Sequence, residues 1–69
     1  SDEEILSYKD DLQAKLDKLK NEIYALEKRL SNKGYIEKAP EKLVEETKRS
    51  LSDKKRQTTH IGEQLSEIS

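Results

Sequence analysis

The stretch LSNKGYIEKAPE, residues 30–41, decides the fold, because it separates two long segments that each repeat apolar residues with helical spacing. Asn32 and Gly34 follow the last leucine of the first segment and form a stop signal for a helix. Gly34 is able to take the left-handed conformation that other residues avoid. We therefore expect a first helix over about residues 2–31, followed by a turn over residues 32–39.

The end of the same stretch starts a second helix. Pro40 suits the first helical position, where its missing N–H costs nothing, and Glu41 suits the positive end of the helix dipole. We expect this helix to cover about residues 40–67. Gly62 disfavours it by roughly 1 kcal/mol relative to alanine, so we expect fraying beyond about Gln57.

Apolar residues in the first segment recur in alternating steps of four and three from Leu12 to Leu30. This heptad repeat lines up apolar side chains along one face of a helix and is typical of coiled coils. Ser1 and Glu4 have the spacing of a capping box, which predicts the start of the helix. The first seam consists of Ile5, Leu12, Leu16, Leu19, Ile23, Leu26 and Leu30.

The second segment has a matching seam, in which Thr47, Lys54 and Thr58 interrupt the apolar residues. Two seams joined by a short connection fold back on each other, because each alone would stay exposed to water. The sequence therefore predicts an all-α fold, an antiparallel two-helix coiled-coil hairpin. The second seam is Val44, Thr47, Leu51, Lys54, Thr58, Ile61, Leu65 and Ile68. Folding about residue 35 would pair Leu26 with Val44, Leu19 with Leu51, and Ile5 with Leu65, with a slip of one heptad as the alternative.

Composition excludes most other classes of protein. Of the 69 residues, 30% are apolar and 42% are charged, which is too little apolar material for a layered globular core. No apolar run approaches the roughly 18 residues of a membrane span. The sequence holds no methionine, so we expect a fragment of a larger protein.

No catalytic or metal-binding constellation is apparent. His60 is the only histidine and there is no cysteine, whereas a metal site or a nucleophile–base pair needs partners. We interpret His60 as a solvated helix residue, and we expect neither an enzymatic activity nor a cofactor in this chain.

Charge is segregated along the chain, although the net charge is only −1. Residues 28–56 hold 10 basic and 5 acidic side chains, whereas residues 1–27 hold 4 basic and 8 acidic ones. In a hairpin the basic part lies at the loop end, where cations on a rigid rod can follow a phosphate backbone. The alternative is an ordinary coiled-coil surface with pairs such as Glu45–Arg49. The candidate RNA-binding residues are Arg29, Lys33, Lys38, Lys42, Lys48, Arg49, Lys55 and Arg56.

Tyr35 and Ile36 lie in the connection, and two roles are open to them. Tyr35 can stack on an exposed base, or both residues can cap the last layer of the seam. We favour the structural role.

The stretch from Leu30 to Pro40, followed by Leu43-Val44 and Leu51, closely resembles the C-terminal arm of valyl-tRNA synthetases. That pattern has a leucine and an asparagine before the turn, an aromatic residue, Lys-Ala-Pro, a branched pair, and a leucine seven residues on. The motif covers about 22 residues, and the flanking heptads extend the resemblance over the whole chain. Leu43, Ser50 and Thr47 depart from it, at positions where a valine, a lysine and an acid, respectively, are common.

The resemblance implies a tRNA-binding hairpin that packs against the outer corner of valine tRNA, where the D and T loops meet, by shape and backbone recognition. The rest of a cytoplasmic class I aminoacyl-tRNA synthetase would then bind ATP and valine and perform catalysis. Arg49, Lys55 and Arg56 become the preferred phosphate contacts. By the same resemblance, the turn is formed by Asn32, Gly34, Tyr35, Ala39 and Pro40, together with Lys38.

Two other functions remain as alternatives. The chain can be a structural or protein-interaction hairpin that does not touch RNA. It can also self-associate, because polar residues interrupt both seams, although we expect a monomer.

Overall fold

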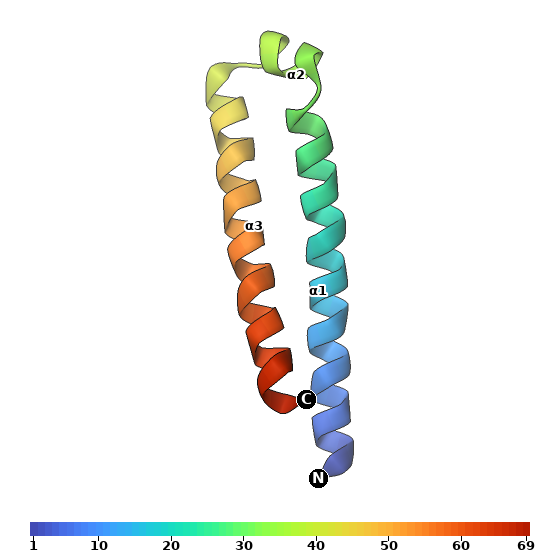
Figure 1. Cartoon of the computed structure of the whole chain (residues 1–69). Helices are drawn as coiled ribbons and strands as arrows, with labels where there is room; N and C mark the ends of the chain where they lie inside the picture. The colour runs from blue at the N-terminus through green and yellow to red at the C-terminus, as the bar shows by residue number, and fades with distance from the viewer.

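The computed structural model describes all residues, 1–69, and contains three helices. Helix α1 spans Asp2–Leu30, the short helix α2 spans Lys33–Lys38, and helix α3 spans Glu41–Ile68. The two long helices run antiparallel, with α2 across the closed end and both termini at the open end (Figure 1). The molecule is a rod of 53 × 14 × 13 Å, and the predicted all-α hairpin is confirmed.

The start of α1 follows the predicted capping box. The Ser1 hydroxyl accepts from the Glu4 backbone N–H at 3.3 Å, and the Glu4 carboxylate accepts from the Ser1 amino group at 3.3 Å. Three acids in the first turn complement the positive end of the helix dipole. Local sequence therefore suffices to begin this helix.

The connection between the long helices differs from the expected turn, because most of it is helical. Asn32 is the N-cap of α2, and its side-chain oxygen accepts from the backbone N–H groups of Gly34 at 2.9 Å and Tyr35 at 3.3 Å. The expected left-handed conformation of Gly34 is wrong, since no residue has a positive φ. Asn32 achieves the reversal by capping a new helix, so no left-handed residue is needed.

Pro40 stands one position earlier than expected, as the N-cap of α3. Its carbonyl accepts from the N–H groups of Leu43 and Val44 at 2.9 and 3.1 Å. Its fixed φ of −55° suits this junction. Helix α3 continues through Gly62 to Ile68, close to the expected range of about residues 40–67.

The core is a single stripe between α1 and α3. The buried residues are Leu12 and Leu19 on α1 and Val44 and Thr47 on α3. The remaining seam positions are half-buried, except Ile5, which is 50% exposed. Both heptad seams thus face each other, whereas residues 2–8 at the start of α1 are all exposed.

The polar residues of the second seam all find partners. The Thr47 hydroxyl lies 2.8 Å from the Leu43 carbonyl, and the Thr58 hydroxyl lies 2.9 Å from the Lys54 carbonyl. Lys54 donates to the Glu22 carboxylate at 2.8 Å. No buried side-chain polar atom lacks a partner, so these interruptions do not leave the core with uncompensated polar groups.

The register of the helices is close to the alternative that was left open, a slip of one heptad. A fold about residue 35 would place Lys48 opposite Glu22, but Glu22 pairs with Lys54 instead. Leu19 accordingly lines a surface hollow with Lys54 and Ile61, which agrees with the slipped register and not with a pairing of Leu19 with Leu51. The expected partner of Ile5, Leu65, is displaced by the same shift, and α1 projects beyond the end of α3 (Figure 1).

Candidate nucleic-acid interface

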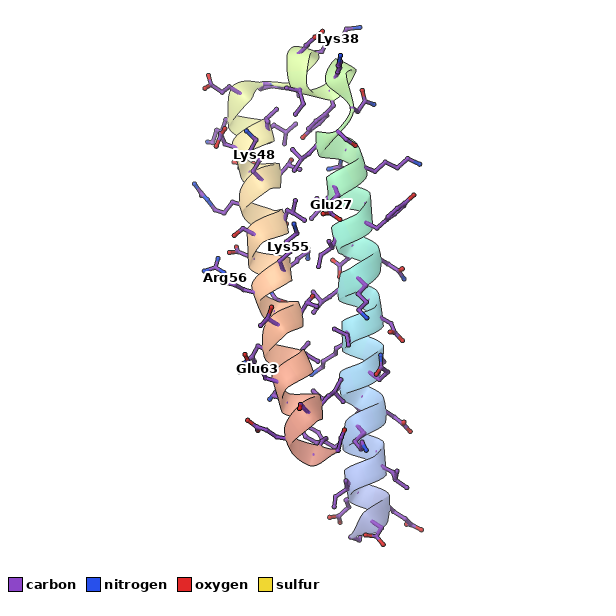
Figure 2. All side chains as sticks on the ribbon, viewed as in Figure 1. Glu27, Lys38, Lys48, Lys55, Arg56 and Glu63 are labelled. Atoms are coloured by element: carbon purple, nitrogen blue, oxygen red, sulfur yellow. The ribbon has the colours of Figure 1, made fainter.

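All eight candidate RNA-binding side chains are exposed. Four belong to the closed end of the hairpin, and we call them the tip cations: Arg29, Lys33, Lys38 and Lys42. The other four lie along α3 as far as its middle, and we call them the α3 cations: Lys48, Arg49, Lys55 and Arg56. Figure 2 shows this progression, with Lys38 on the tip and Lys48, Lys55 and Arg56 further along the rod.

The tip is stiffened by Tyr35. Its hydroxyl lies 2.8 Å from the Thr47 hydroxyl, which links α2 to α3. The guanidinium of Arg29 lies 5.8 Å from the centroid of the Tyr35 ring, within the range of a cation–π contact. Tyr35 therefore contacts both long helices, as its structural role requires. Ile36 is 40% exposed and lines a surface hollow with Leu30.

Three of the α3 cations already have carboxylate partners. Lys48 lies 3.6 Å from Glu45, and Arg56 pairs with Asp53 on the same helix. Lys55 lies 3.4 Å from Glu27, which belongs to α1. Glu45 is thus paired with Lys48, and the expected Glu45–Arg49 pair is not formed. Arg49 and the tip cations form no ion pair.

A second interhelical pair differs from these in its burial. The side chains of Lys54 and Glu22 are 25% and 36% exposed, and their charged atoms lie 2.8 Å apart. The hydrogen bond from Lys54 holds the pKa of the Glu22 carboxyl below its ordinary value, and burial opposes this only in part. This pair belongs to the seam and not to the exposed surface.

Sequence reasoning missed the acids that accompany the candidate cations. The spacing of three residues between Glu45 and Lys48, and between Asp53 and Arg56, is a local signal from which both pairs could have been predicted. The pairing of Glu27 with Lys55 had no such signal. It depends on the register of two helices, which the sequence left open.

No group of three or more histidine, cysteine or acidic residues is placed to hold a metal ion. His60 is exposed on α3. None of the helices is apolar enough over a sufficient length to cross a membrane.

The fold and the surface define a rigid helical arm that exposes cations at one end. A comparison with protein families agrees with this class, since the family model described as the valyl tRNA synthetase tRNA binding arm matches residues 5–69. The chain therefore belongs to the valyl tRNA synthetase tRNA binding arm family, as the resemblance predicted.

The individual relatives that match are named valine–tRNA ligases. The chain is 38% identical over 60 residues to a valine–tRNA ligase of Thermotoga maritima, covering 87% of this chain and 7% of that protein. It is 43% identical over 54 residues to one of Prochlorococcus marinus, covering 78% and 6%, respectively. A third, from Oceanobacillus iheyensis, is 39% identical over 57 residues, covering 83% and 6%. The chain thus spans only 6–7% of the length of these relatives. No solved structure matches.

Proposed function

We propose that this chain is the arm with which a valine–tRNA ligase holds the outer corner of valine tRNA, where the D and T loops meet. The observation that carries the proposal is the position of the eight exposed candidate cations, between the tip and the middle of α3. A rod of this kind can contact phosphates of a folded RNA without reading bases. The remainder of the ligase, in the cytoplasm, would bind ATP and valine and perform catalysis.

The arrangement of charge supports contact by the closed end. Residues 28–56 carry twice as many basic as acidic side chains, 10 against 5, whereas residues 1–27 carry the reverse excess. Phosphates are therefore attracted to the tip and repelled from the open end. Arg29 is held over Tyr35, so this cation loses less side-chain freedom on binding than a free arginine would.

The test is a titration of the folded chain into labelled valine tRNA at about 50 and about 200 mM salt. Contact with three or four phosphates predicts an affinity that falls about 40- to 150-fold over this range, because bound cations are released from the RNA. A tRNA whose corner is disrupted serves as the control and should bind more weakly. Salt-independent binding, or equal binding to both RNAs, would overturn the proposal.

Charge reversals locate the contact. Arg49→Glu combined with Arg56→Glu should weaken binding at least about tenfold. Lys15→Glu combined with Lys20→Glu makes the same change of net charge on the acidic part of α1 and should have little effect. If the folded chain does not bind tRNA at the lower salt concentration, or if both double variants bind like the parent chain, a structural hairpin becomes the better function.

A further inference from the structure

A shallow hollow of about 420 Å³ lies along α3, on the flank that carries three of the eight candidate cations. Leu51 is its only hydrophobic lining residue, and the hydroxyls of Ser52 and Thr59 lie beside the basic side chains. The Thr59 hydroxyl bonds to the Lys55 carbonyl at 3.2 Å, whereas the Ser52 hydroxyl has no protein partner. The hollow is lined by Lys48, Leu51, Ser52, Lys55, Arg56 and Thr59.

The hollow suits an anion, because two lysines and an arginine line it together with a free hydroxyl donor. In the structure their charge is met by carboxylates. Two of these, Glu45 and Asp53, belong to α3 itself and lie within one turn of their partners. Glu27 is different, because it reaches Lys55 from α1 across the helix interface (Figure 2).

The ion pair between Glu27 and Lys55 is weak enough for another anion to replace the Glu27 carboxylate. Its two side chains are 52% and 55% exposed, and its N–O distance of 3.4 Å is longer than a strong charged hydrogen bond. The Lys54–Glu22 pair, at 2.8 Å and 25% and 36% exposed, is the tighter interhelical link. The hairpin therefore keeps a seam contact of its own when Lys55 leaves Glu27.

We propose that this hollow binds a phosphodiester of the RNA. In the free arm Glu27 pairs with Lys55, and on binding the phosphate takes the place of the Glu27 carboxylate. This inference rests on the proposed function and assigns Glu27 a role in it. The carboxylate lowers the affinity for any isolated phosphate. RNA that also engages the tip cations gains enough contacts to displace it, so Glu27 biases the arm toward an RNA of matching shape.

The test is Glu27→Gln, measured with valine tRNA at several salt concentrations. Removal of the competing carboxylate should tighten binding about two- to fivefold, the range expected for an exposed ion pair. The gain should shrink as the salt concentration rises, because salt screens the Lys55–Glu27 pair that competes with the phosphate in the parent chain. Glu3→Gln makes the same change of net charge at the open end, forms no ion pair in the parent chain, and should leave affinity within error.

A double-mutant cycle separates Glu27 acting through Lys55 from a general effect of charge. In a Lys55→Gln background, Glu27→Gln should change affinity less than about 1.5-fold if the two residues are coupled. An equal gain with and without Lys55 would overturn the inference, as would weaker binding by Glu27→Gln. Both results leave the proposed function intact provided that Arg49→Glu with Arg56→Glu still weakens binding. Circular dichroism confirms that each variant is folded.

Discussion

Lys54 occupies a position of the second seam where an apolar residue is expected, and its ammonium bonds to the Glu22 carboxylate at 2.8 Å. A half-buried lysine needs such a partner, because an unpaired charge in the seam would be costly. The same bond specifies which turns of α1 and α3 face each other. A polar residue in a seam commonly fixes register in this way.

The Glu22–Lys54 bond makes stability depend on pH. Because the pKa of Glu22 in the folded chain lies below its ordinary value of 4.5, the bond contributes stability above that value. The contribution is lost as the pH falls through the lower pKa of the folded state. We expect Glu22→Gln to melt at a lower temperature than the parent chain near pH 7, and the difference to shrink on acidification below about pH 4.5.

The measurement is thermal unfolding followed by circular dichroism from about pH 7 to about pH 3. Glu63→Gln is the control, because Glu63 lies on α3 and forms no ion pair. A difference between the parent chain and Glu22→Gln that stays constant down to the lowest pH would show that the carboxylate charge is not what stabilises the seam.

At the scale of the helices, Gly62 is the weakest point of α3. A Cβ atom added there would meet nothing within 4 Å, so alanine gains helix propensity without a steric penalty. We expect Gly62→Ala to raise the free energy of unfolding by about 0.5–1 kcal/mol. For a chain of this size the melting temperature should rise by several degrees.

Gly34→Ala is the matched control for this substitution. Its Cβ would lie 3.2 Å from the Asn32 side-chain oxygen, the atom that caps α2. We expect it to gain less than Gly62→Ala or to lose stability, as measured by urea unfolding of both variants. Equal gains would mean that the cap tolerates the crowding, and a loss at Gly62 would contradict the open space around it.

The helices were predictable because their signals are local. The capping box at Ser1 and the heptad spacing each act within a few residues, and so does the stop at Asn32. The conformation of Gly34 was not predictable in the same way. Asn32 can end one helix and cap the next, and the sequence does not say which geometry follows.

The register and part of the candidate site depend on contacts between helices. Tyr35 meets Thr47 from 12 residues away, and Lys54 meets Glu22 from 32 residues away. Heptad spacing alone is satisfied equally after a slip of seven residues, so the sequence could not predict these bonds between helices and the structure was needed to identify them. The basic residues could be identified from charge segregation, whereas the position of Glu27 beside Lys55 follows from the register.

At the scale of the whole molecule, apolar side chains are exposed at both ends of the rod. Leu6 and Tyr8 are 60% and 46% exposed near the open end, and Leu43 is 44% exposed near the tip. The first turn of α1 carries three acids beside the exposed residues of the open end, whereas acidic and basic residues are mixed around Leu43. Like charges brought together by self-association would repel.

We therefore expect the chain to remain a monomer of 8.0 kDa over a roughly hundredfold range of concentration at low salt. Sedimentation equilibrium measures this directly, and a mass that rises with concentration would contradict it. High salt screens the acids around the open end, so any association that appears there should increase with salt. Ile5→Asp adds another negative charge to the exposed first turns of α1 and should reduce association at high salt. Association that is unaffected by Ile5→Asp must use another surface.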